Sequence, residues 1–204
     1  MTLKNKTYSN FTIKDIEDLG LSFGDLAHIF DRSKHVQPSE WLLETLSISV
    51  QLSAITEKAK SENYITPILM EVKRKNINKF TFLSGCEFNV DESKGLKGFC
   101  DYILVKSANT MVIQSPILSI VEAKFDAVQS PRAIAQCIAE MYAAQQFNLG
   151  RKTGITTIFG IVTNADEWLF LKLEDNKVTT EQHTYSRLLL PELLGTLQQI
   201  IDFY

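Results

Sequence analysis

The spacing of hydrophobic residues is helical in the first third of the chain. Apolar side chains recur there every three or four residues, as on one face of a helix. Pro38 suits the first turn of a helix, whereas Pro67 requires either a helix start or a kink. The pattern predicts three helices, over residues 13–30, 38–60 and 61–75. Gly20 and Gly24 interrupt the first of them.

Beyond residue 79 the apolar positions alternate, which is typical of strands. A polar turn that contains Gly95 and Gly98 predicts a hairpin between two of these strands. The Ile-Leu-Ser-Ile-Val run from Ile117 predicts a central, mostly buried strand. The expected strands cover residues 79–90, 99–106, 117–125, 155–163, 168–174 and 178–185. The expected helices cover residues 131–147, with an end at Gly150, and residues 191–204.

This order of elements predicts a mixed α/β fold in a single domain. Three strands form a meander, and a helix then leads by a right-handed crossover to a fourth strand parallel to the third. We divide the chain into a helical N-terminal extension (1–60), a core (61–163) and a C-terminal hairpin with a helix (164–204). Neither a repeat nor a linker separates these segments.

Composition narrows the class of protein but leaves its partner open. Apolar residues make up 45% and charged residues 22% of the chain, as in globular proteins. Without an apolar run of ~20 residues or a secretory signal, we expect a cytoplasmic protein and no membrane partner. The three cysteines and three histidines lack the spacing of a zinc site or a disulfide framework. A net charge of −3 neither favours nor excludes a nucleic-acid partner.

An acid followed later by an acid-x-lysine pair is the most informative chemical pattern. Asp101 precedes Glu122 by 21 residues (122 − 101 = 21), and Lys124 follows two residues later. Glu122 and Lys124 project from the same strand face, and Asp101 on the neighbouring strand would lie ~5 Å away. Buried charges are costly unless something uses them. They could form a structural ion pair, but we favour an active site around a divalent cation.

The pattern resembles the PD-(D/E)XK, or restriction-endonuclease-like, nuclease superfamily over residues 61–163. Three segments also resemble a group of small uncharacterised restriction-endonuclease-like proteins: Ser84–Asp91, Gly95–Asp101 and Val121–Lys124. The resemblance implies a core in which the elements follow the order α-β-β-β-α-β. It departs from the family pattern where Cys100, and not proline, precedes the first acid.

The resemblance also implies roles for the charged residues. Asp101, Glu122 and the backbone carbonyl of Ala123 would bind Mg²⁺ or Mn²⁺, cations that prefer oxygen ligands. Lys124 would be the catalytic lysine, which orients or deprotonates the attacking water or stabilises charge on the phosphate.

Two further polar residues are candidates by the same resemblance. Gln136 matches the glutamine of a helix that contacts the site in RecB-like nucleases, although Glu140 stands where that pattern has tyrosine. Gln136 and Glu140 share one helix face, so they could equally form a hydrated polar edge. Glu62 matches an acid of the first core helix, with Glu71 as the alternative; the other interpretation is an acid that the helix dipole favours.

These observations predict a metal-dependent nuclease that hydrolyses DNA through a metal-activated water, with a homodimer suited to cutting two strands. The alternative is a catalytically silent nuclease fold that binds nucleic acid or assembles with other proteins. A sugar- or nucleotide-phosphate hydrolase is disfavoured because no glycine-rich phosphate loop is present. We expect the aromatic residues of the strands to pack in the core or across strands: Phe80, Phe82, Phe88, Phe99, Phe159, Trp168 and Phe170.

Overall fold

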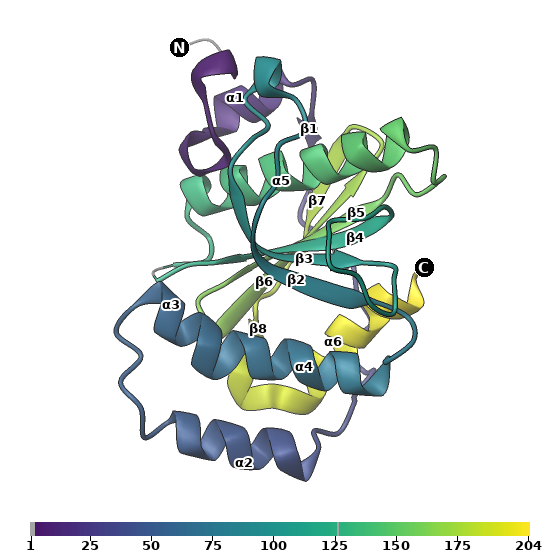
Figure 1. Ribbon diagram of the computed structural model, residues 1–204. Coiled ribbons are helices and arrows are strands. Elements are labelled where there is room, and N and C mark those ends of the chain that lie inside the picture. The colour runs from purple at the N-terminus through teal and green to yellow at the C-terminus, as the bar shows by residue number, and fades with distance from the viewer. Residues whose placement is uncertain (1–2, 126) are drawn as a thin grey trace.

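The computed structural model describes residues 3–125 and 127–204, which form an eight-stranded mixed sheet with helices on both faces (Figure 1). The described strands are β1 (Ser22–Phe23), β2 (Thr81–Glu87), β3 (Phe99–Val105), β4 (Ile117–Ala123), β5 (Ile158–Thr163), β6 (Glu167–Glu174), β7 (Lys177–Thr180) and β8 (Tyr185–Ser186). The described α-helices are α1 (Ile13–Asp18), α2 (Glu40–Ser49), α3 (Glu57–Lys60), α4 (Thr66–Lys75), α5 (Pro131–Gly150) and α6 (Leu190–Asp202). The mixed α/β class predicted from the sequence is therefore confirmed.

The sheet has the strand order β1-β7-β6-β5-β4-β3-β2, and β8 pairs with β6. Strands β2, β3 and β4 form an antiparallel meander, and β5 runs parallel to β4 after the connection through α5. Both features agree with the predicted hairpin and crossover. Strand β1 comes from the N-terminal segment and β6 to β8 from the C-terminal one, so a single sheet joins the three segments of the chain.

Alternation along the central strands divides the core between the two faces of the sheet. Ile103 and Ile120 belong to a buried cluster with α5 and the N-terminal segment. The residues next to them, Tyr102 and Val121, belong to a cluster with α2, α4 and α6 on the other face. Because strand side chains alternate between faces, each central strand contributes to both layers.

The predicted helix over residues 13–30 is wrong beyond its first turns. Thr12 caps α1, which ends at Asp18, and Gly20 then adopts a positive φ of 86°. The chain continues as β1, which pairs with β7. A left-handed residue cannot continue a right-handed helix, so the backbone hydrogen bonds of residues 22–24 go to the sheet.

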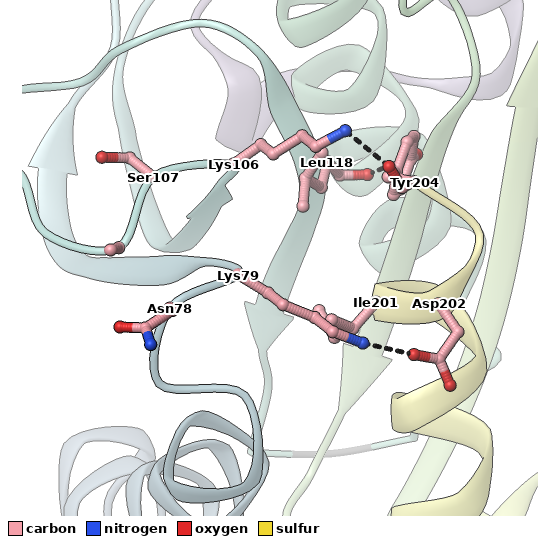
Figure 2. A pocket seen from close by; sticks show the side chains of 9 residues that line it. Asn78, Lys79, Lys106, Ser107, Leu118, Ile201, Asp202 and Tyr204 are labelled. Atoms are coloured by element: carbon pink, nitrogen blue, oxygen red, sulfur yellow. Dashed lines mark hydrogen bonds and ion pairs between the residues drawn. The ribbon is translucent and has the colours of Figure 1, made fainter.

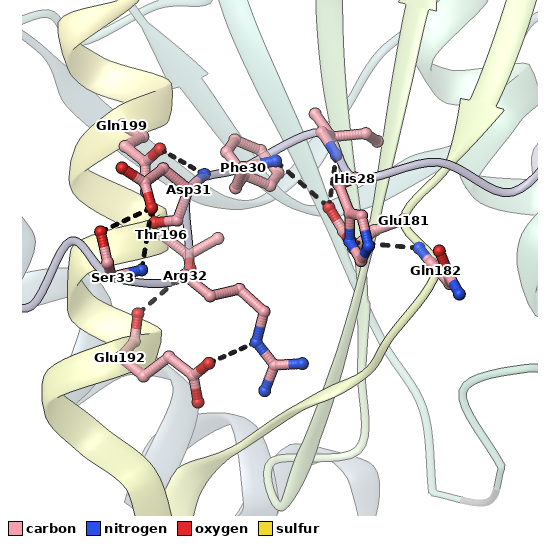
Figure 3. A network of polar contacts seen from close by, with 11 residues as sticks. His28, Phe30, Asp31, Arg32, Ser33, Glu181, Gln182, Glu192, Thr196 and Gln199 are labelled. Atoms are coloured by element: carbon pink, nitrogen blue, oxygen red, sulfur yellow. Dashed lines mark hydrogen bonds and ion pairs between the residues drawn. The ribbon is translucent and has the colours of Figure 1, made fainter.

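The next segment is held in an extended form by acceptors far away in sequence (Figure 3). The carboxylate of Glu181 accepts hydrogen bonds from the backbone N–H groups of Ile29 (2.7 Å) and Phe30 (3.3 Å). Arg32 pairs with Glu192 of α6 at 2.5 Å. These long-range bonds satisfy backbone groups that a helix would otherwise pair internally.

The second predicted helix, over residues 38–60, is broken in the middle. Helix α2 begins after Ser39, whose side chain caps it, so Pro38 lies just outside the helix. It ends at Ser49, and helical structure resumes only at α3, which Thr56 caps. The cap at Thr56 starts a separate helix.

The third predicted helix, over residues 61–75, is confirmed. A π-helical turn (Ser61–Ile65) joins α3 to α4, and Pro67 lies in the first turn of α4. The backbone is helical on both sides of Pro67, because Ile65 and Thr66 already have right-handed helical dihedral angles. The π-helical turn changes the hydrogen-bond pattern just before the residue that lacks an N–H donor.

Most of the strand aromatics are buried or partly buried, as predicted, but Phe99 is not. Phe99 is 68% exposed. Phe99 is the first residue of β3 and pairs with Glu87, the last residue of β2. The alternating pattern reports the face on which a strand residue lies, but not whether another layer covers it.

Helix α5 lies against the sheet at a glycine. A Cβ atom on Gly160 of β5 would collide with the sulfur atoms of Met141 and Cys137 on α5. Helix and strand can therefore approach closely only because Gly160 lacks a side chain. Within the described residues, the helices include none with the combination of length and apolarity that a membrane crossing requires.

Candidate active site

The register of β3 and β4 brings Asp101 and Glu122 next to each other. Tyr102 pairs with Val121, so the antiparallel ladder places Asp101 opposite Glu122. The backbone N–H of Ala123 donates a hydrogen bond of 2.8 Å to Oδ2 of Asp101. Asp101 and Glu122, which are 21 residues apart in the chain, therefore lie side by side on two inner strands of the sheet.

Lys124 follows the last residue of β4 and points along the sheet toward α5. Its backbone N–H donates to the carbonyl of Thr163 on β5 at 2.7 Å, which continues the parallel ladder by one bond. Its Nζ atom donates to Oε1 of Glu122 and, at 3.0 Å, to Oε1 of Gln136. The ammonium group is therefore held between a carboxylate and an amide.

Helix α5 supplies Gln136 and Glu140 from its buried face. Ser130 caps the helix by accepting from the N–H of Ala133 at 3.1 Å. Nε2 of Gln136 donates to Oε1 of Glu140 at 3.1 Å, and Glu140 is fully buried. The polar residues thus form one chain of contacts that runs from Glu122 through Lys124 and Gln136 to Glu140.

Burial dominates the electrostatics of the three acids. It raises the pKa of Glu122 to about 7, and the nearby charge of Asp101 adds to the shift. Burial also raises the pKa of Asp101 above its ordinary value, against the hydrogen bond from Ala123. The pKa of Glu140 lies well above its ordinary value, first because of burial and then because of Glu122. Carboxyl groups this close resist simultaneous ionisation.

The base in this cluster keeps its proton. Burial alone would lower the pKa of Lys124, but the carboxylate of Glu122 outweighs burial, so the pKa lies above its ordinary value. Lys124 is therefore a cation at neutral pH. It offsets part of the negative charge that Asp101 and Glu122 bring to the sheet edge.

The donor set fits a hard divalent cation in one respect. Oε2 of Glu122 is buried and receives no hydrogen bond from an N–H group, but the carboxyl group of Glu140, whose Oε2 also lacks a donor, lies within hydrogen-bond reach of it. Asp101 and Glu122 could supply two oxygen ligands, and Mg²⁺ commonly takes one or two carboxylates and keeps several waters. Among the residues that the structure describes, no group of three or more His, Cys, Asp or Glu side chains is arranged to hold a metal.

Two surface cavities open beside these residues. One, of about 360 Å³, is lined by Asp101, Ala123 and Glu62, among others. The other, of about 310 Å³, is lined by Lys124 and Gln136. Ligands can therefore approach the cluster from two cavities, and Ala123 lines the one that contains Asp101.

The two candidate acids of the first core helix have different surroundings. Glu62 lies in the π-helical turn, has a side chain that is 62% exposed and pairs with Lys58 at 3.8 Å. It lines the cavity of Asp101 but has no direct contact with the cluster. Glu71 is buried and binds Ser39 and Arg74 instead. The structure thus places Glu71 outside the site.

Glu57 is the site residue that the sequence pattern missed. It is the first residue of α3 and lines both cavities. One of its carboxylate oxygens accepts from the backbone N–H of Phe125 at 3.0 Å, a contact across 68 residues. The Thr56 cap marks a helix start in the sequence, but nothing local predicts a partner so distant in the chain.

A cavity of about 470 Å³ on another part of the sheet has its charges satisfied internally (Figure 2). Nζ of Lys79 pairs with Asp202 of α6 at 2.9 Å. Nζ of Lys106 donates to the backbone carbonyl of Tyr204. Asp202 is the one acidic side chain among the described residues that line this cavity, so the cavity offers no pair of carboxylates for a divalent cation.

Comparisons with known proteins found no match from which a function could be assigned. No protein-family model matches the chain, and no curated protein matches it significantly. A functional assignment therefore rests on the arrangement of four residues around the end of β4: Asp101, Glu122, Lys124 and Gln136.

Proposed function

We propose that the protein is a metal-dependent nuclease that hydrolyses phosphodiester bonds of DNA, with a restriction-endonuclease-like core. The order of elements from α4 through β2, β3, β4 and α5 to β5 supports this core. The single observation that carries the proposal is the position of Lys124. Its ammonium group lies between Glu122 and Gln136, and the neighbouring strand holds Asp101.

Each residue then has a distinct task. Asp101 and Glu122 hold Mg²⁺ or Mn²⁺, and the carbonyl of Ala123 is a third ligand. The cation, when bound, supplies an acidified water and neutralises charge on the phosphate. Lys124 would orient or deprotonate the attacking water, or stabilise negative charge on the phosphate, from its place beside Glu122.

Gln136 and Glu140 position the lysine without touching the substrate. Gln136 accepts from Lys124 and donates to Glu140, which fixes the orientation of its amide. Burial, followed by the charge of Glu122, raises the pKa of Glu140 well above its ordinary value. Its carboxyl oxygen anchors the amide of Gln136 on the same face of α5.

The test is incubation with plasmid and with single-stranded DNA in Mg²⁺, Mn²⁺ or EDTA. We expect cleavage that EDTA abolishes and that Glu122→Ala and Lys124→Ala each reduce by about 100-fold or more. A matched pair serves as the control, since Lys172 and Glu174 also stand two residues apart on a strand and pair at 3.1 Å. Lys172→Ala and Glu174→Ala should cleave like the unmodified protein.

A catalytically silent protein that binds nucleic acid is the second candidate. The observation in its favour is that the described residues contain no group of three acids or metal-binding side chains around a common point. DNA binding without cleavage, unaffected by EDTA, would select this candidate over the first.

A further inference from the structure

Two phenylalanines lie exposed directly beside the proposed catalytic residues. Phe99 precedes Asp101 by two residues and is 68% exposed, and Phe125 follows Lys124 and is 44% exposed. A single exposed apolar residue is common on protein surfaces. These two line separate cavities: Phe125 lines the one that contains Lys124 and Gln136, and Phe99 lines another.

The cavities follow one another around the end of the sheet. Phe99 lines a cavity of about 540 Å³ that includes Ser9, and Ser9 also lines the cavity of Phe125 and Lys124. Glu57 in turn lines both that cavity and the one that holds Asp101. An extended ligand could therefore contact Phe99, Phe125 and the cluster in succession.

Two cations along this path have no carboxylate partner among the described residues. Arg132 is exposed, and its Nε atom donates to the backbone carbonyl of Ser9 at 3.2 Å. Lys60 donates to the backbone carbonyl of Phe125 at 3.0 Å, and its Nζ atom lies 4.6 Å from the centre of the Phe125 ring. Within the described residues both cations bind backbone carbonyls, and phosphate is an anion of the kind that such side chains bind.

The strand opposite Asp101 leaves room for a chain to pass. Ser84 pairs with Tyr102 and Cys86 with Cys100, so Gly85 lies opposite Asp101, with a φ of 62°. Gly85 lines the same cavity, and a Cβ built on it would meet no atom within 4 Å. Glycine inside a strand commonly marks a place where another backbone approaches closely.

We propose that this path binds an unpaired nucleic-acid strand, with bases stacked on Phe125 and Phe99 and phosphates beside Arg132 and Lys60. Aromatic side chains with cations beside them bind single strands with little sequence preference, because every base has a face that can stack. In a duplex those faces are already stacked on neighbouring bases. This inference rests on the proposed function for the chemistry, and it specifies the substrate class of the same site.

The decisive measurement is metal-free binding, which does not depend on catalysis. Binding of a fluorescently labelled DNA strand is measured in EDTA and compared with binding of the same strand annealed to its complement. The strand has about 16 nucleotides, the upper end of the site sizes known for a single-strand-binding OB fold. A labelled RNA strand of the same sequence separates DNA from RNA. We expect the single strand to bind at least tenfold more tightly than the duplex.

Variants identify the stacking platforms. Phe125→Ala and Phe99→Ala should each weaken binding of the single strand by about tenfold, in the range of one lost base–aromatic stack. Phe125→Trp should retain binding. Phe23→Ala is the matched control, since Phe23 is 40% exposed on β1, at the opposite edge of the sheet. Because these side chains are exposed, the fold should tolerate their removal, which thermal unfolding checks.

Two arginines near opposite ends of α5 test whether positive charge beside the path contributes to binding. Arg132→Ala should weaken binding and reduce its dependence on salt by about one counterion. Arg151→Ala removes an exposed charge after the other end of α5, where the guanidinium lies 4.3 Å from the Phe147 ring, and should change neither quantity.

Equal binding of duplex and single strand, or identical effects of Phe125→Ala, Phe99→Ala and Phe23→Ala, would overturn the inference. These results would leave the proposed nuclease activity intact if EDTA-sensitive cleavage is present. Conversely, tight single-strand binding that requires Phe125, without cleavage in Mg²⁺ or Mn²⁺, would support the inference and overturn the nuclease proposal.

Discussion

Gln136 on α5 accepts a hydrogen bond of 3.0 Å from Nζ of Lys124, which directly follows β4. The same amide group donates to Glu140 one turn later. The helix therefore determines where the ammonium group lies, although the lysine belongs to the sheet. This relationship makes α5 part of the proposed catalytic machinery and leads to the first prediction.

Gln136→Ala is expected to lower kcat for DNA cleavage by about tenfold and to leave KM nearly unchanged, as changes to supporting residues often do. The physical reason is that Lys124 loses one of its two hydrogen-bond acceptors. Gln136→Glu, which keeps the acceptor oxygen, should restore part of the rate. Steady-state kinetics on a defined oligonucleotide measures both quantities.

Gln145 is the control for this prediction, because it is also a buried glutamine of α5. Its Nε2 atom donates to the carbonyls of Thr156 and Asp175, away from the cluster. Gln145→Ala should lower the free energy of unfolding but leave kcat unchanged. Equal losses of kcat in the two alanine variants would show that α5 acts only through general stability.

Divalent cations are expected to stabilise the folded protein. A ligand that binds only the native state at 100 times its Kd adds about 2.7 kcal/mol. For a chain of this length, this corresponds to a rise in Tm of about 5–10 °C. Asp101→Asn should abolish the rise, since it removes a charged ligand but keeps an acceptor for the Ala123 N–H. Calorimetry with Mg²⁺, Mn²⁺ and EDTA measures the shift, and an unchanged shift in Asp101→Asn would exclude this carboxylate as a ligand.

Glu71 should matter for stability and not for cleavage. Burial raises its pKa, but hydrogen bonds from Ser39 and the charges of Lys75 and Arg74 outweigh burial, so the pKa lies below 4.5. The ionised carboxylate therefore stabilises the fold at pH values above 4.5, and this contribution disappears as the pH falls through the lowered pKa. Glu71→Gln should cost about 2 kcal/mol at pH 7.

Urea unfolding at a series of pH values checks this sign. The difference in unfolding free energy between the unmodified protein and Glu71→Gln should shrink as the pH is lowered below 4.5. Glu62→Gln, at a largely exposed residue, is the control and should change stability by less than about 0.5 kcal/mol. A constant difference at every pH would refute the proposed role of the ionised carboxylate.

Glu140 should tolerate loss of its titratable group. Burial, followed by the charge of Glu122, holds the pKa of Glu140 well above its ordinary value, so an uncharged side chain suits this position. Glu140→Gln, a neutral side chain of similar size, is expected to change the free energy of unfolding by less than about 1 kcal/mol. Glu140→Ala leaves a cavity and should cost at least about 2 kcal/mol. Chemical denaturation at pH 7 compares the two, and equal costs would contradict this expectation.

The sheet and the cluster were predictable because short-range periodicity determines them. Side chains alternate between the two faces of β4, which places Glu122 on one of them, and the antiparallel pairing of β3 with β4 brings Asp101 opposite. Gln136 lies on the buried face of a helix whose start Pro131 marks. Their contacts follow from these local patterns, whereas their catalytic roles remain predictions.

The features that the sequence did not predict depend on contacts between distant residues. Residues 29–30 are extended because Glu181, about 150 residues later, binds their N–H groups. Glu57 reaches the cluster through a hydrogen bond to Phe125. The exposure of Phe99 depends on which elements fail to cover the end of β3. No local window of the chain contains this information.

The missing side chain of Gly160 has a consequence for how the chain could vary. A methyl group there would push α5 outward, and the displacement would move Gln136 and Glu140 away from Lys124. A residue that never meets substrate would then decide whether the lysine is aligned. Few substitutions of Gly160 should therefore preserve the proposed activity, as few as at the charged residues of the cluster. A survey of functional variants would test this.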